Sequence, residues 1–71
     1  MDVGQIVGKN IRKFRKQQRL SQDELAHLAG MARAYISEVE RGNKNISVTR
    51  LSWIASALKI EITDLFAGYK N

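Results

Sequence analysis

A chain of 71 residues has room for one small domain, and this chain carries a formal net charge of +5 at pH 7. It contains no cysteine and a single histidine, His27, which excludes a disulfide framework, a thiolate zinc site and a histidine-rich metal cluster. No apolar run approaches the roughly 20 residues of a membrane span, and no secretory signal is visible. We therefore expect one cytoplasmic domain over residues 1–71 that needs no cofactor or metal and binds a polyanion.

The N-terminal segment has apolar residues at every third or fourth position, which predicts a helix over residues 3–18. The buried stripe of this helix is expected to contain Val3, Val7, Ile11 and Phe14. The opposite side is basic and contains Lys9, Arg12, Lys13, Lys16 and Arg19. This basic arc fits a solvated face, and it equally fits a surface that attracts DNA and contacts phosphates near the helix ends.

A second helix is predicted to begin at Gln22, because Ser21 and Glu24 have the spacing of a capping box. It is expected to end at Gly30, since glycine tolerates the positive φ that often terminates a helix. Its expected inward residues are Leu25, Leu28 and Ala29.

The remaining chain also follows helical spacing. A third helix is predicted over residues 32–41, followed by Gly42 and a polar loop over residues 43–45. Ser47 is the expected N-cap of a fourth helix, whose inward residues are Val48, Leu51, Ile54, Ala55 and Leu58. Thr63 is expected to cap a fifth helix over residues 64–67 that carries Leu65 and Phe66. Five helices without a strand pattern predict an all-α fold.

Three small or apolar residues have the spacing of a helix-turn-helix unit over residues 22–42. Ala26 suits a close crossing of two helices, and Gly30 permits the turn between them. Ile36 follows at the position where a third helix packs back against Ala26 and Leu25. Their joint spacing between helix caps predicts that the third helix enters the major groove of duplex DNA.

The sequence over these residues resembles the Cro and phage-repressor type of helix-turn-helix protein. The resemblance covers about residues 7–66 and is strongest in S-Q-D-E-L-A-H-L-A-G-M-A-R-A-Y-I-S-E-V-E-R-G. A narrower stretch, R-A-Y-I-S-E-V-E-R-G-N-K-N-I-S-V, is similar to the controller proteins of bacterial restriction-modification systems. This resemblance implies a five-helix DNA-binding domain that regulates transcription, as a repressor or as an activator.

The resemblance also implies roles for particular residues. Gln22 matches a glutamine that contacts phosphate, a role that its position at a helix N-terminus suits. Arg15 and Glu40 match a buried structural salt bridge. Ala32 departs from the pattern, which has Ser or Thr there, so the third helix should lack a side-chain N-cap.

A helical wheel places Ala32, Ile36 and Val39 of the third helix toward the core, with Glu40 at the margin. The outward face contains Arg33, Ala34, Ser37, Glu38 and Arg41. Arg33 is the strongest candidate for base recognition, because an arginine can donate two hydrogen bonds to guanine O6 and N7.

The other DNA-facing residues have alternative roles. Ala34 fits a thymine methyl contact or an inert position, and Ser37 fits a base or a phosphate. Glu38 fits a cytosine contact or repulsion of wrong registers. Tyr35 is expected to pack its ring and to direct its hydroxyl toward a phosphate. Asn43, Lys44 and Asn45 fit either a clamp on the DNA backbone or an ordinary polar turn.

The C-terminal segment has more apolar residues than a small monomer is expected to cover. Some should fold onto the core, and the remainder should form a homodimer surface over about residues 53–66. The candidates are Trp53, Ile60, Ile62, Leu65 and Phe66. In the family that the sequence resembles, dimers place two recognition helices about 34 Å apart, so we expect a homodimer on a roughly palindromic operator. The narrower resemblance to controller proteins implies control of restriction-modification genes and of its own promoter.

Other classes of function fit less well. An enzyme is disfavoured because His27 has no cysteine partner and Ser21 and Ser37 have no visible base. An antitoxin-type module that binds both a protein and DNA is the main alternative. Antitoxins of the family that the sequence resembles usually carry an extra segment that binds the toxin, whereas only residues 68–71 follow the predicted fold here. A peptide that binds membrane surfaces is disfavoured because packing uses the apolar stripes.

Overall fold

The computed structural model describes residues 2–70, which form four α-helices and one 3₁₀ helix and contain no strand. The α-helices are α1 (Val3–Gln17), α2 (Gln22–Ala29), α3 (Arg33–Glu40) and α4 (Val48–Leu58), and the 3₁₀ helix is η1 (Ile62–Phe66). The all-α prediction is confirmed, with the fifth element a 3₁₀ helix in place of an α-helix.

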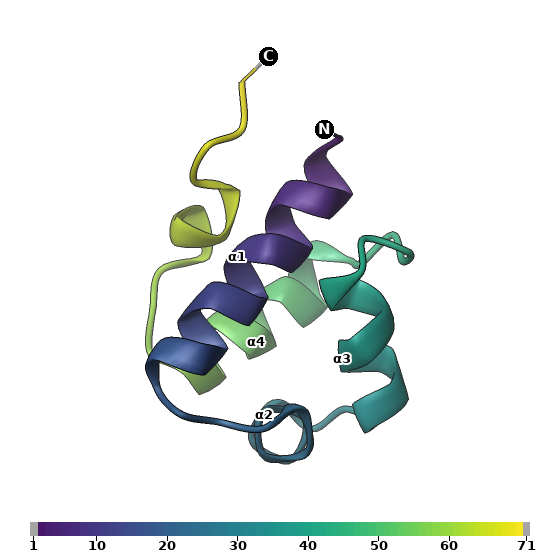
Figure 1. Ribbon diagram of the computed structural model, residues 1–71, viewed down its shortest axis with the longest axis vertical. Coiled ribbons are helices and arrows are strands. Elements are labelled where there is room, and N and C mark those ends of the chain that lie inside the picture. Colours follow the sequence, from purple (N-terminus) through teal and green to yellow (C-terminus); the bar gives the residue numbers. More distant parts are fainter. Residues whose placement is uncertain (1, 71) are drawn as a thin grey trace.

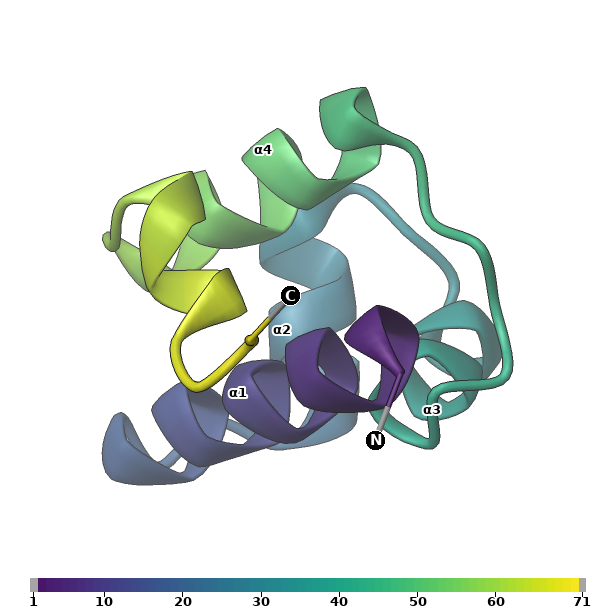
Figure 2. The ribbon, with the colours of Figure 1, turned by 90° about the horizontal axis from the view of Figure 1, so that it is seen from above.

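The helices enclose one core within dimensions of 32 × 21 × 20 Å. α1 packs against α3 and η1, while α2 packs against α3 and α4. Figure 1 shows α2 nearly end-on below α1, with α3 to one side and α4 behind. In Figure 2 α1 and α4 lie on opposite sides of α2. α3 therefore lies at the edge of the fold, with α1 and α2 as its support.

Aliphatic residues from every helix form the core. The fully buried side chains are Ile11, Leu25, Ile36, Val39, Ile54, Leu58 and Leu65. Ala26 is buried in the same cluster as Leu25 and Ile36, as the spacing of the turn predicts. Burial of these side chains stabilises the fold by about 1.5–3 kcal/mol for each large one.

Four residues that the wheels place inside are exposed. Leu28 is 57% exposed because the buried arc of α2 is centred on Leu25, Ala26 and Ala29, more than a quarter-turn away. Val48 is 72% exposed in the first turn of α4. The other two are Val3, in the first turn of α1, and Ala32, an extended N-cap that precedes the helix to which the wheel applies.

The C-terminal element begins earlier than predicted. η1 starts at Ile62, and the Asp64 carboxylate accepts a hydrogen bond of 2.9 Å from the backbone N–H of Glu61. The prediction that Thr63 caps an α-helix over residues 64–67 is therefore wrong. The element is a 3₁₀ helix that begins before Thr63, and Asp64 provides the side-chain hydrogen bond at its N-terminus.

Among the described residues, no helix has the length and apolar character to cross a membrane.

Candidate nucleic-acid interface

The turn between α2 and α3 depends on Gly30, which has φ +70°. The N–H of Met31 donates to the Ala26 carbonyl at 2.9 Å, which closes the end of α2. A Cβ at Gly30 would meet no atom within 4 Å, so its left-handed backbone conformation, not space, explains the glycine. This turn sets α3 against α2 at the crossing that Ala26 permits.

The N-terminus of α2 carries the predicted capping box. Ser21 Oγ accepts from the Glu24 N–H at 3.0 Å, and Glu24 Oε1 accepts from the Ser21 N–H at 2.8 Å. The N–H groups of Gln22 and Asp23 precede the first intrahelical partners, so they remain able to donate to an anion.

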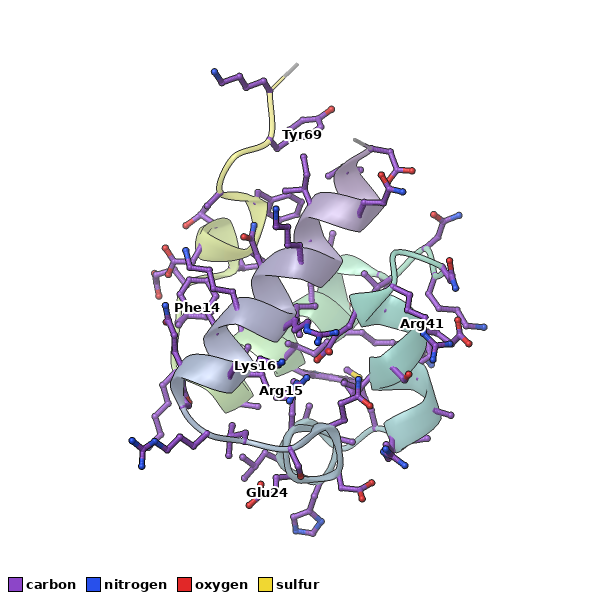
Figure 3. The ribbon with its side chains drawn as sticks, viewed as in Figure 1. Phe14, Arg15, Lys16, Glu24, Arg41 and Tyr69 are labelled. Atoms are coloured by element: carbon purple, nitrogen blue, oxygen red, sulfur yellow. The ribbon has the colours of Figure 1, made fainter. Side chains whose placement is uncertain are left out.

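A bidentate ion pair connects α1 to the end of α3. Arg15 Nε lies 2.7 Å from Glu40 Oε2, and Arg15 Nη2 donates to Glu40 Oε1 at 3.0 Å. Gln22 Nε2 also donates to Glu40 Oε1 at 3.2 Å. Figure 3 shows Arg15 on α1 directed toward the space between α2 and α3. The ion pair that the family resemblance implies is therefore present, and it orients the side chain of Gln22 as well.

The outward face of α3 is open to a ligand. Arg33 and Ala34 are exposed, and Ser37 and Glu38 are half-buried. Arg33 Nε lies 3.6 Å from Asp23 Oδ1, in a pair whose side chains are 65% and 74% exposed. Because such exposed pairs contribute only about 0–1 kcal/mol, Arg33 can exchange Asp23 for another partner.

The start of α3 has the features expected from its sequence. Ala32 makes no side-chain cap hydrogen bond. Tyr35 is half-buried, and the Arg50 guanidinium lies over its ring, 5.0 Å from the centroid. The ring of Tyr35 is thus packed, as predicted.

Glu38 organises the end of α3 and the loop that follows it. Its Oε2 accepts from Asn43 Nδ2 at 3.0 Å, and its Oε1 lies 3.5 Å from Arg41 Nη1. Lys44 and Asn45 are exposed beyond this anchor. Figure 3 shows Arg41 at the same end of α3, so basic side chains flank the outward face.

The five residues expected at a dimer surface lie in different places. Leu65 has no exposed surface, so its assignment to an interface is wrong: it is a core residue that anchors η1. Ile60 and Ile62 are partly buried against the core. Phe66 borders an open groove, whereas Trp53 lines a separate hollow beside α2.

Sequence reasoning missed two polar groups. Asp2 caps α1 by accepting from the Gln5 N–H at 2.8 Å, and the spacing of Asp2 and Gln5 is the signal of a capping box. Asn10 is buried and its amide donates to two carbonyls of the C-terminal segment. Its position three residues after Val7, within the apolar stripe, is the signal that identifies it.

This arrangement, with one helix exposed on a capped and buttressed support, defines a helix-turn-helix DNA-binding domain. A family model described as helix-turn-helix matches residues 11–65. The chain therefore belongs to the helix-turn-helix family of transcriptional regulators.

Controller proteins are among its relatives. Control protein C.SmaI of Serratia marcescens is 37% identical over 73 residues, which cover 100% of this chain and 87% of that protein. Control protein C.MunI of Mycoplasma sp is 34% identical, with 99% and 96% covered. The crystal structure of the restriction-modification controller protein C.AhdI from Aeromonas hydrophila has a TM-score of 0.87 and 40% identity, covering 89% of this chain and 96% of that one.

Proposed function

We propose that this regulator binds a specific, roughly palindromic DNA site as a homodimer and controls genes linked to a restriction-modification system, its own promoter among them. The observation that carries the proposal is the outward face of α3, which is exposed beside the free N–H groups at the start of α2. The similarity to controller proteins over nearly the whole chain supports the class of target genes.

Base recognition is assigned to the first half of α3. Arg33 is the only arginine or lysine in that half, and its exposed partner, Asp23, holds it only weakly. A guanidinium that leaves Asp23 can donate two parallel hydrogen bonds to a guanine in the major groove. Ala34 and Ser37 lie beside it on the same face and are assigned to neighbouring bases or phosphates.

Phosphate contacts are assigned to both ends of the unit. At α2, the side chain of Gln22 is held by Glu40, and one N–H of its amide remains for a phosphate. After α3, the exposed Lys44 and Asn45 would bind the DNA backbone without reading sequence. Arg12 and Lys16 on α1 are exposed and add to the positive charge that attracts DNA.

The homodimer is assigned to the apolar part of what we call the Phe66 groove, the part lined by Val3, Ile46, Val48 and Phe66. Lys44 and Asn45 also line the groove, but a second copy on the apolar part would leave them free to bind DNA. Val3 and Val48 are 41% and 72% exposed, so the groove offers apolar surface for a partner to cover. It adjoins the loop that follows α3. A second copy on its apolar part would direct both α3 helices toward one face of the DNA, about 34 Å apart.

The test begins with selection of bound sequences from a random duplex library. Affinities for the selected site and its single-base variants are then compared for Arg33→Ala, Arg33→Lys and a control, Lys59→Gln, at an exposed position after α4. Arg33→Ala should lose preference at one base pair and about 1–3 kcal/mol of binding free energy. Arg33→Lys should retain charge but lose that preference, because lysine lacks the fork of two donors.

The control distinguishes recognition from electrostatics. Lys59→Gln should bind every duplex nearly as well as the wild type. If Arg33→Ala keeps the base preference of the wild type, base recognition by Arg33 is rejected. If selection enriches no sequence, specific DNA binding by the isolated chain is rejected.

A further inference from the structure

Asn10 is a buried polar residue in the middle of α1. It is 8% exposed and lies next to Ile11, which has no exposed surface. Its Nδ2 donates to the Leu65 carbonyl at 2.8 Å and to the Ala67 carbonyl at 2.9 Å. Both N–H bonds of one amide thus connect α1 to the end of η1, which Figure 1 shows beside α1.

Phe66 lies between the two carbonyls that Asn10 binds. On its N-terminal side, the Leu65 side chain is fully buried in the core. That apolar anchor fixes the depth of η1, while the two hydrogen bonds fix the peptide group before Phe66 and the peptide group after Ala67. The position of the Phe66 ring in its groove therefore depends on Asn10 as well as on Leu65.

Asn10 does not itself line the Phe66 groove. It borders a different hollow, together with Lys9, Lys13 and Gly68. A second copy that covers the groove would therefore be affected by Asn10 only through the segment that Asn10 holds. η1 has five residues, and a 3₁₀ helix of this length has little stability of its own.

We propose that Asn10 is a positioning residue for self-association, because its amide clamps the Leu65 and Ala67 carbonyls and holds Phe66 in the surface that a second copy covers. The inference rests on the proposed homodimer. Without the clamp, the two carbonyls would turn toward water and the segment around Phe66 would leave its place. Dimer affinity should then fall while the core, which Leu65 and its neighbours form, persists.

Sedimentation equilibrium of the full chain without DNA tests the inference, in the wild type, Asn10→Ala, Phe66→Ala and the double variant. Asn10→Ala should raise the dimer dissociation constant about tenfold, and Phe66→Ala at least as much. The double variant should be no weaker than Phe66→Ala alone, because Asn10 acts through Phe66. Gln17→Ala, which removes an exposed amide from the end of α1, is the control and should dimerise as the wild type does.

Trp53 fluorescence and a milder variant separate positioning from loss of the fold. Trp53 lies beside His27 and Leu28, outside the Phe66 groove, so its emission reports the folded monomer. The emission of Asn10→Ala should match that of the wild type at the temperature of the sedimentation run. If Asn10→Ala melts below that temperature, Asn10→Ser replaces it, and its smaller loss of dimer affinity should likewise disappear in the Phe66→Ala background.

The outcomes distinguish the inference from the homodimer on which it rests. A wild type that stays monomeric at tens of micromolar overturns the proposed homodimer, and the inference with it. A wild-type dimer whose affinity is unchanged in Asn10→Ala overturns the inference alone. Additive effects in the double variant also overturn it, because they would mean that Asn10 acts independently of Phe66.

Discussion

Arg15 and Glu40 form a bidentate ion pair whose side chains are 9% and 2% exposed, with N–O distances of 2.7 and 3.0 Å. Arg15 also donates through Nη1 to the Leu20 carbonyl at 2.8 Å. One guanidinium therefore connects the end of α1, the loop before α2 and the end of α3. Because the pair is removed from water, its two members depend on each other more strongly than surface ions do.

Glu40→Gln should destabilise the fold by about 3–5 kcal/mol, because it leaves the Arg15 guanidinium buried without a counter-charge. Total stability of small domains is about 5–15 kcal/mol, so the variant would lose a large share of it. Urea denaturation followed by circular dichroism measures the change.

A paired replacement is the control for that measurement. Arg15→Met combined with Glu40→Leu should recover most of the loss, since apolar side chains of similar size leave no unpaired charge. Glu24→Gln is a matched single variant, because Glu24 is an exposed member of a capping box and its loss should be small. A Glu40→Gln protein as stable as Glu24→Gln would show that the ion pair contributes little.

Gly8→Ala should weaken DNA binding by moving α3. A Cβ at Gly8 would lie 2.8 Å from the Glu40 carbonyl oxygen and closer still to that of Val39. Backbone must shift to admit it, at a cost of about 1–3 kcal/mol, and these carbonyls belong to the end of α3, to which DNA recognition is assigned. Urea denaturation and titration of the selected duplex measure the two effects.

Gly4→Ala is the matched control, because a Cβ there would meet only Asp2 Oδ1 at 3.4 Å and the Gly42 carbonyl at 3.7 Å. Gly4 lies in the first turn of α1, where alanine gains less than the roughly 1 kcal/mol that it gains over glycine in a helix interior, so this variant should be as stable as the wild type or slightly more so. Equal stability and equal DNA affinity for Gly8→Ala would contradict the close contact between α1 and α3.

The sequence predicts helices better than it predicts which of their faces are buried. Caps at Ser21 and Ser47 and the glycine at Gly30 act over a few residues, so the patterns around them locate α2 and α4 closely. Whether Leu28 is buried or exposed depends instead on where α3 and α4 cross α2. An eight-residue helix has too few turns for its sequence to show which face those helices cover. The core position of Leu65 does not follow from the sequence either, because apolar residues of the core and of a surface look alike in sequence.

In the candidate site, too, local features can be predicted from the sequence and tertiary contacts cannot. The outward face of α3 follows from helical periodicity: Arg33 and Ala34 are exposed as the wheel predicts, whereas Ser37 and Glu38 are half-buried. The hydrogen bond from Gln22 to Glu40 and the anchoring of Asn43 by Glu38 are tertiary contacts that no spacing indicates. Only the family resemblance implies the ion pair of Arg15 with Glu40, because a wheel places Glu40 at the margin of the buried face.

Ala32→Ser should stabilise the protein by about 1 kcal/mol, because a serine hydroxyl at the N-cap can accept from an N–H of α3 that now lacks a side-chain partner. For a chain of this length that gain raises the melting temperature by about 4–8 °C. Thermal unfolding monitored by circular dichroism measures it. Ala34→Ser adds the same hydroxyl inside α3, where it caps nothing, so an equal gain there would reject the capping explanation.

Lys44→Ala should weaken binding to all duplexes alike, because Lys44 is exposed in the loop after α3 and is assigned to the DNA backbone. Loss of one phosphate contact should reduce the slope of log affinity against log salt concentration by about 1. Titrations at several salt concentrations, on the selected duplex and on an unrelated one, measure both effects. Lys59→Gln removes the same charge far from α3 and should leave the slope nearly unchanged. If Lys44→Ala lowers affinity only for the selected duplex, Lys44 recognises sequence, and the backbone role assigned to it is wrong.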